Sequence, residues 1–188
     1  MTRSVIELPV TSDDRRIAQL AALAIGLTLA EAAIPSPIPG VKPGLANIVI
    51  LMVLLQYGWR AAAWVSALRL VAGGLLLGSL FAPGFWLGAA GAFVSLSMLG
   101  LARHLPQRFF GPVSLSVLAA FGHIGGQLAL AGLWLLPAVA VFKLLPVFAA
   151  AALIFGAVNG VIVARLLAGS VLSGRQSAPC SPPSKPSP

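Results

Sequence analysis

The chain has 188 residues, of which 59% are hydrophobic and only 9% are charged, and its mean hydropathy is +0.98. A soluble domain carries roughly 25% charged residues, so this composition excludes a soluble globular protein and predicts an integral membrane protein. The net charge of +8 does not indicate a nucleic-acid partner, because the basic residues stand singly between apolar blocks. Orientation in a membrane explains their distribution better.

Six apolar blocks predict an all-α membrane protein, a single bundle of six transmembrane helices. A polar leader covers residues 1–16, the membrane domain covers 17–167, and a Ser/Pro-rich tail at 168–188 is predicted to be disordered. The expected spans are residues 17–34, 44–58, 61–81, 85–102, 113–135 and 143–167.

The second block is short, since it covers only about 21 Å of a hydrocarbon core that is nearer 30 Å thick. It follows a stiff connector, Ile34 to Asn47, which contains four prolines and two glycines and cannot continue a regular helix. The connector is therefore expected to dip into the membrane, where protein or a water-filled cavity must surround it.

The lysines and arginines predict the orientation of the bundle. If the N-terminus is cytoplasmic, nine of them fall on the inner side and only Lys42 and Lys143 fall on the outer side, while Arg69 lies within a span. The positive-inside rule then places both termini in the cytoplasm and the connector outside.

Polar side chains within apolar spans are costly in lipid and mark candidate sites. His123 and Gln127 are four residues apart, so they share one face of the fifth span. Lys42 and the positive end of the second span favour an anionic headgroup such as a carboxylate or a phosphate. We predict one outward-facing ligand pocket lined by Glu31, Lys42, Asn47, Arg69, His123 and Gln127.

Each of these residues also has a structural interpretation. Arg69 could snorkel toward the inner interface or neutralise the glutamate in an ion pair. His123 and Gln127 could form a hydrogen-bond clamp between helices. Lys42 could anchor the connector at the interface, and Asn47 could cap the second helix.

Small residues recur four apart on four of the predicted spans, a pattern that lets helix backbones approach closely in lipid. Internal packing is the leading interpretation, and a surface for a partner protein is the other. The stripes are Ala18, Ala22, Gly26 and Ala30; Gly74 and Gly78; Gly122 and Gly126; and Ala152, Gly156, Gly160 and Ala164.

Motifs for catalysis are absent from the sequence. The chain has four acidic residues in all, whereas Mg²⁺ sites generally need clustered carboxylates. It contains no nucleotide-binding or zinc-binding spacing, and Cys180 is its only cysteine. We therefore expect no catalytic residue, no metal and no cofactor.

The run PGVKPGLANIVILMVL, followed by ALRLVAGGLLLGSL and GHIGGQL, resembles the Gx transporter family, which is also labelled heptaprenyl diphosphate synthase component I. The resemblance covers about residues 21–167. Pro43 replaces the usual Leu, and Ile124 and Gly125 stand where Asn and Ile are usual. The matching site residues are Lys42, Asn47, Arg69, His123 and Gln127.

The resemblance implies a six-helix protein of a bacterial cytoplasmic membrane, similar to the S-components of energy-coupling-factor importers. It also implies that the stripe at Ala18, Ala22, Gly26 and Ala30 resembles a docking surface for a transmembrane coupling subunit that works with an ATPase. The first hypothesis is thus a transport or substrate-capture subunit for a small anionic or isoprenoid- or quinone-related ligand, with the connector as a lid.

The second hypothesis is a non-catalytic membrane component of heptaprenyl diphosphate or menaquinone synthesis that recruits a soluble prenyl diphosphate synthase. A scaffold for a membrane redox complex is a third. In all three cases the expected partners include membrane lipid and exclude nucleic acid.

Overall fold

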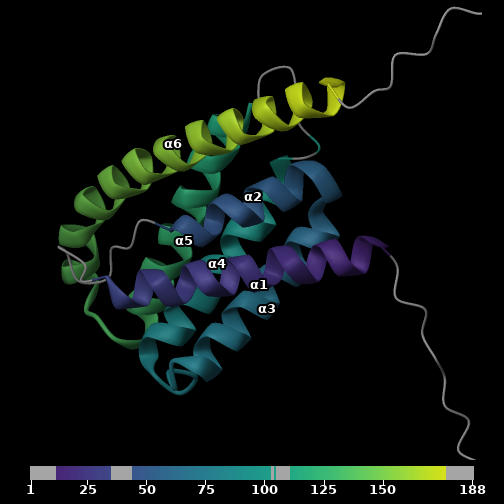
Figure 1. Ribbon diagram of the computed structural model, residues 1–188. Coiled ribbons are helices and arrows are strands. Elements are labelled where there is room, and N and C mark those ends of the chain that lie inside the picture. The colour runs from purple at the N-terminus through teal and green to yellow at the C-terminus, as the bar shows by residue number, and fades with distance from the viewer. Residues whose placement is uncertain (1–11, 35–43, 103, 105–110, 177–188) are drawn as a thin grey trace, which may run out of the picture.

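The computed structural model describes residues 12–34, 44–102, 104 and 111–176, and the side chains as far as residue 169. Every regular element in this part of the chain is a helix (Figure 1). The helices are α1 (Ser12–Ala33), α2 (Leu45–Tyr57), α3 (Trp59–Leu76), α4 (Pro83–Ala102), α5 (Pro112–Trp134) and α6 (Ala138–Gln176).

Glycine and proline set several of the helix ends. Gly58 alone separates α2 from α3, and its φ of 85° is a backbone conformation that other residues rarely adopt. Pro83 and Pro112 stand at the first positions of α4 and α5, where a missing backbone N–H costs nothing. Six helical segments were expected, and six helices are present in the described residues.

Four predicted boundaries were wrong. The first segment begins at Ser12 rather than at residue 17, within the predicted polar leader. The third segment ends at Leu76 rather than Phe81, because Gly78 adopts a φ of 62° and turns the chain. The sixth begins at Ala138, directly after Pro137, rather than at Lys143, and it accommodates Pro146 within the helix. It also continues to Gln176, beyond the expected end at residue 167. Residues 1–11, 35–43 and 177–188 lie outside the described part, as do most of the predicted connector and tail.

The helices pack as two groups of three. In the first group α1, α2 and α3 contact one another, and in the second group α5 lies between α4 and α6. Contacts of α2 with α5 and α6, and of α3 with α4, join the groups. The first group has a core of its own, built mainly from alanine and valine, which includes Ala24, Val53, Ala62 and Val65.

Glycines bring the helices of the second group together. A Cβ at Gly126 on α5 would lie 2.6 Å from the backbone oxygen of Ala90 on α4, and one at Gly160 on α6 would lie 2.6 Å from the Cα of Val113 on α5. These distances leave no room for a side chain. The stripes on the fifth and sixth spans therefore serve internal packing, in agreement with the leading interpretation of them.

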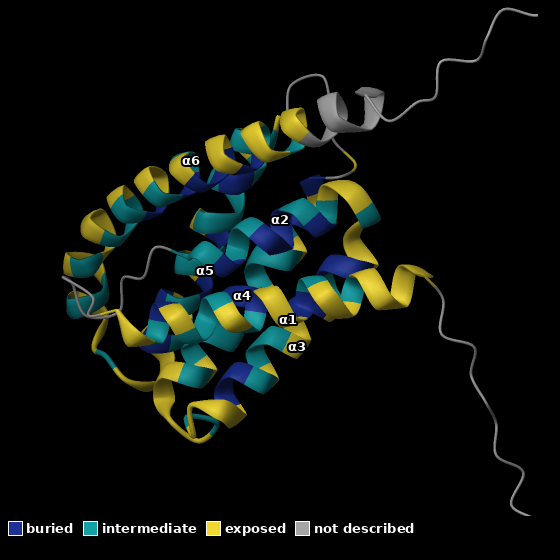
Figure 2. Cartoon of the chain, in the orientation of Figure 1, coloured by how far each residue is buried: buried dark blue, intermediate teal, exposed yellow. Residues whose placement is uncertain are grey.

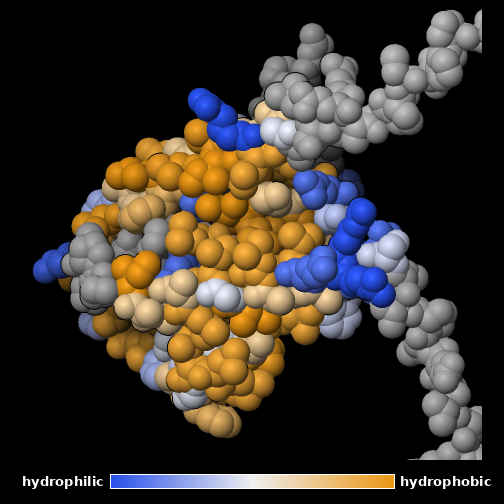
Figure 3. All heavy atoms as spheres, in the orientation of Figure 1, coloured by the Kyte–Doolittle hydropathy of each residue, from blue (hydrophilic) through white to orange (hydrophobic). Residues whose placement is uncertain are grey.

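The exterior of the bundle is apolar. Large side chains such as Phe81, Phe93 and Leu133 are between 73% and 94% exposed, and the outward face of α6 is largely exposed (Figure 2). Figure 3 shows a hydrophobic surface over the middle of one face, with hydrophilic residues gathered mainly where α1 begins. Such a surface requires lipid or a partner rather than water.

Four helices, α1, α4, α5 and α6, are long and apolar enough to cross a membrane, and α2 is a shorter apolar helix. The protein is thus an all-helical, membrane-embedded protein. The start of α1 and the end of α6 lie toward the same side of the molecule (Figure 1). The count of six spans and the cytoplasmic location of both termini stay predictions.

Candidate functional site

A cavity of about 720 Å³ lies between the two groups of helices and is lined by residues from all six of them. Its wall is mostly apolar, with a small number of polar side chains. Volume and lining are those of a pocket for a small organic molecule, which typically has about 300–1,000 Å³ and a few well-placed polar groups.

The start of α2 forms one polar end of the cavity. Gly44, which precedes the helix, has a φ of 70°, and a Cβ there would lie 3.1 Å from the amide nitrogen of Asn47. The carboxylate of Glu31 on α1 accepts a hydrogen bond from the backbone N–H of Leu45, the first residue of α2. Asn159 on α6 donates from Nδ2 to the carbonyl oxygen of Gly44 at 3.3 Å. Side chains from α1 and α6 thus fix the point where α2 begins.

These contacts resolve two alternatives left open by the sequence. Gly44, not Asn47, occupies the N-cap position of α2, and Glu31 occupies the partly positive end of that helix. A carboxylate of the chain itself thus bonds at this helix end, and binding of an anionic ligand there stays a prediction.

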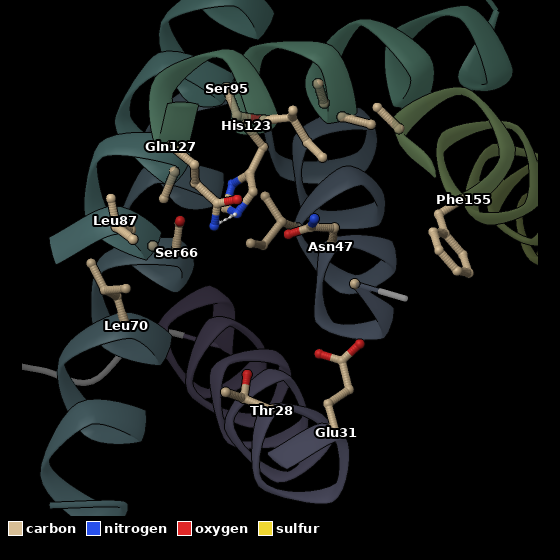
Figure 4. Close-up of a pocket in the computed structure, with 18 of the residues that line it drawn as sticks. Thr28, Glu31, Asn47, Ser66, Leu70, Leu87, Ser95, His123, Gln127 and Phe155 are labelled. Carbon is tan, nitrogen blue, oxygen red and sulfur yellow. Dashed lines mark hydrogen bonds between the residues drawn. The ribbon is translucent and has the colours of Figure 1, made fainter. Parts of the chain in front are cut away.

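The opposite wall carries the pair on α5. His123 Nε2 and Gln127 Nε2 lie 3.3 Å apart, and both side chains face the cavity across from Asn47 (Figure 4). Gly91 on α4 lies directly behind them, since a Cβ there would come within 2.7 Å of the His123 carbonyl oxygen and 2.9 Å of Gln127 Cγ. The pair bonds within one helix, so it does not act as a clamp between helices through this contact.

Arg69 on α3 completes the polar lining. Its Nε is buried and has no hydrogen-bond partner among the described residues. It interacts electrostatically with Glu31 and His123, yet in the described part of the chain no ion pair joins it to Glu31. Ser66, one turn earlier on the same face of α3, is 2% exposed and lines the same cavity.

The structure thus brings five of the six predicted site residues to one cavity, namely Glu31, Asn47, Arg69, His123 and Gln127. Lys42 lies outside the described residues. That these side chains bind a ligand stays a prediction.

The sequence analysis missed several polar lining residues: Thr28, Ser66, Ser116 and Asn159. Asn159 could have been included, because it is an amide within an apolar span, the same signal that marked Gln127. The hydroxyl residues give no such signal, since a serine or threonine in a helix can bond to its own backbone, as Thr28 does to the Ala24 carbonyl.

The small-residue stripe on α1 points away from the cavity. Ala18, Ala22, Gly26 and Ala30 are all exposed, whereas Ala21, Ala24 and Glu31 of the same helix are buried. A Cβ at Gly26 would meet nothing within 4 Å. This stripe therefore differs from those on α5 and α6, which are used inside the bundle.

Within the described residues, no group of three or more His, Cys, Asp or Glu side chains is placed to hold a metal ion. The polar groups present can donate and accept hydrogen bonds and supply one positive charge. Their arrangement suits binding and orientation of a molecule.

A comparison with known families gives one match: the family model described as heptaprenyl diphosphate synthase component I covers residues 20–167. No curated protein and no solved structure shows a significant match. The matched region includes every described residue of the cavity wall.

Proposed function

The chain belongs to the heptaprenyl diphosphate synthase component I family, and from this premise we propose that it is a membrane subunit that captures a small molecule in the cavity between its helices. The observation that carries the proposal is the convergence of polar side chains from α1, α2, α3 and α5 on one hollow inside an otherwise apolar bundle. Polar groups are expensive at such a position, and a ligand that pairs with them offsets that cost.

In the proposed site, each helix contributes a different kind of group. Arg69 supplies the positive charge, while His123 and Gln127 supply hydrogen-bonding groups on the facing wall. Glu31 acts indirectly, because its bond to Leu45 fixes the start of α2 and thereby the position of Asn47. Lys42 and the connector, as the lid, remain part of the proposal without a described geometry.

Transport against a gradient would require a separate energy source, since the sequence has no nucleotide-binding motif. The exposed stripe on α1 is the surface we propose for a transmembrane coupling subunit. It presents four small side chains at four-residue spacing, and close helix approach in lipid depends on this pattern.

Capture is tested by identifying a small molecule that co-purifies with the protein. Protein purified in lipid nanodiscs should release a stoichiometric small molecule on extraction with organic solvent, and mass spectrometry would identify it. Lys42→Ala and Arg69→Ala should each lower the amount recovered, while Arg60→Ala, at the exposed start of α3, should not. Equal recovery from all four proteins, or uptake by dependent cells that is unchanged in the first two variants, would refute the site.

A second candidate function rests on the family match itself. The description "component I" implies association with another component of a heptaprenyl diphosphate synthase. The chain would then be a non-catalytic membrane component in heptaprenyl diphosphate or menaquinone synthesis, placed in a bacterial cytoplasmic membrane with its basic inner loops toward a soluble synthase.

The two functions differ in what a deletion strain loses. A synthase component would alter quinone abundance or side-chain length without abolishing the import of any solute. A capture subunit would reduce uptake or retention of its ligand first. A quinone profile measured beside uptake assays distinguishes them, and the same profile tests the weaker idea of a redox scaffold.

A further inference from the structure

Two of the described side chains that line the cavity carry a charge, and their surroundings differ. Among the described lining residues, Arg69 is the one guanidinium and Glu31 is the one carboxylate. Glu31 bonds to the first N–H of α2, so the partial positive charge of that helix end offsets its charge. Arg69 has a buried Nε with no partner in the described part of the chain. The cavity wall therefore holds a guanidinium whose Nε is available to a further hydrogen-bond acceptor.

A carboxylate pairs with a guanidinium through two parallel hydrogen bonds, so it is a head group that suits Arg69. Neutral groups lie around Arg69 to complete such a head-group site. Ser66 stands one helical turn away and lines the same cavity, and Gln127 and His123 extend into this cavity from α5 (Figure 4). These groups provide hydrogen bonds but no second positive charge.

The rest of the wall is apolar. Leu70 and Leu87 lie beside Ser66, and Phe155 lies on the side of α6 (Figure 4). A ligand that fills this cavity thus needs a small charged head and a larger apolar body. The volume of about 720 Å³ admits such a molecule.

We propose that the cavity selects an amphipathic monoanion, with a carboxylate head at Arg69 and an apolar body against Leu70, Leu87 and Phe155, and that it discriminates against a diphosphate head. A phosphate monoester alone carries roughly −1.5 to −2 charges at neutral pH, and a diphosphate carries more. Arg69 is the one described lining group that opposes that charge, and the surrounding wall is mostly apolar. Tighter binding of the diphosphate would instead indicate a second cation, such as Lys42, at the head group. This inference rests on the proposed capture function and adds the chemical class of the ligand.

The experiment compares head groups on one tail. Farnesoic acid, farnesol and farnesyl diphosphate share a fifteen-carbon chain and differ in a carboxylate, a hydroxyl and a diphosphate. Binding of each tritiated compound would be measured by equilibrium dialysis against protein in nanodiscs, with empty nanodiscs subtracted for partition into lipid. We expect the acid to bind most tightly to the wild-type protein.

Variants of Arg69 test whether this residue causes the preference for a carboxylate head group. Arg69→Gln should weaken binding of the acid roughly ten- to hundredfold, because a hydrogen bond to a charged group is lost, and should leave farnesol binding unchanged. Arg69→Lys keeps the charge and should retain affinity to within roughly tenfold. Arg60→Gln, the matched change on the exposed start of the same helix, should have no effect.

The outcomes separate this inference from capture itself. Tighter binding of the diphosphate than of the acid, or equal losses of acid and farnesol in Arg69→Gln, overturns the inference while a co-purified molecule still supports capture. No specific binding of any of the three also overturns it. If Arg69→Gln does not fold, the order of head groups on the wild type and the Arg69→Lys variant decide the question.

Discussion

At the scale of single residues, Glu31 on α1 accepts a hydrogen bond from the backbone N–H of Leu45, and Arg69, His123 and Gln127 line the same cavity. Arg69, His123 and Gln127 stood out because charged and amide side chains are rare within apolar spans. The role of Glu31 could not be predicted, since its partner is the backbone of Leu45, 14 residues further along the chain. Pairing with Arg69 was the simpler expectation, and the structure assigns the carboxylate to the end of a helix instead.

Gly44 gives a prediction at this scale. Its φ of 70° costs about 1–2 kcal/mol for any residue with a Cβ, and a Cβ there would crowd the amide of Asn47 at 3.1 Å. Gly44→Ala should therefore lower the free energy of unfolding by about that amount and also weaken ligand recovery, because Asn159 and Asn47 both contact this point.

Gly78→Ala is the control, because Gly78 has a φ of 62° but nothing within 4 Å of its Cβ position. Thermal unfolding in detergent should register a similar loss for both variants, while only Gly44→Ala should affect recovery of the co-purified molecule. Loss of ligand in both would mean that the effect is general instability rather than the geometry of the α2 start.

At the scale of helices, the small-residue stripes were visible in the sequence but their use was not. The stripe on α1 and the stripe on α5 have the same spacing, and only the fold shows that Gly126 faces α4 while Gly26 faces outward. Helix ends were predicted less well than helix existence, since Gly78 and Pro83 mark a turn whose residues could have been assigned to either neighbour.

Adjacent glycines on α5 provide a matched test of packing. A Cβ at Gly126 would lie 2.6 Å from the backbone oxygen of Ala90 on α4, whereas a Cβ at Gly125 would meet nothing within 4 Å. Gly126→Ala should destabilise the protein by about 1–3 kcal/mol, as overpacking does. Gly125→Ala should be neutral or stabilising by about 0.5–1 kcal/mol, because alanine favours a helix.

Thermal unfolding in one detergent compares the two variants directly. Because both variants carry the same substitution at adjacent positions, differences in expression or micelle binding should be small. Equal melting temperatures would show that α4 and α5 can separate at no cost and would contradict the close approach of these helices. The same approach places Gly91 behind His123, so it also supports the cavity wall.

At the scale of the whole molecule, composition determined the class of protein, but the number of crossings depends on two helices. The helix α2 has 13 residues and extends about 20 Å, which is less than the hydrocarbon core. The helix α3 carries Arg60 and Arg69 and is not among the four that are long and apolar enough to span. The hairpin of α2 and α3 therefore either crosses twice or enters and leaves on one side, and an even number of crossings results in both cases.

The turn between α2 and α3 distinguishes these arrangements, and Cys180, the only native cysteine, makes labelling straightforward. In a Cys180→Ser background, Gln56→Cys places one thiol at the exposed end of α2, next to Gly58. With six crossings and cytoplasmic termini, an impermeant maleimide should label this thiol in inverted membranes and not in spheroplasts. In the wild-type protein, Cys180 should label in the same way as the position 56 thiol. In the Cys180→Ser background, Ser79→Cys in the α3–α4 turn should label only in spheroplasts.

The contrary result would come from position 56. A thiol there that resists labelling from both sides, while Cys180 and position 79 react as expected, would show that the hairpin is re-entrant and that four helices cross. Because Arg69 lies on the second arm of this hairpin, that result would also place the cavity closer to the outer surface than six crossings do.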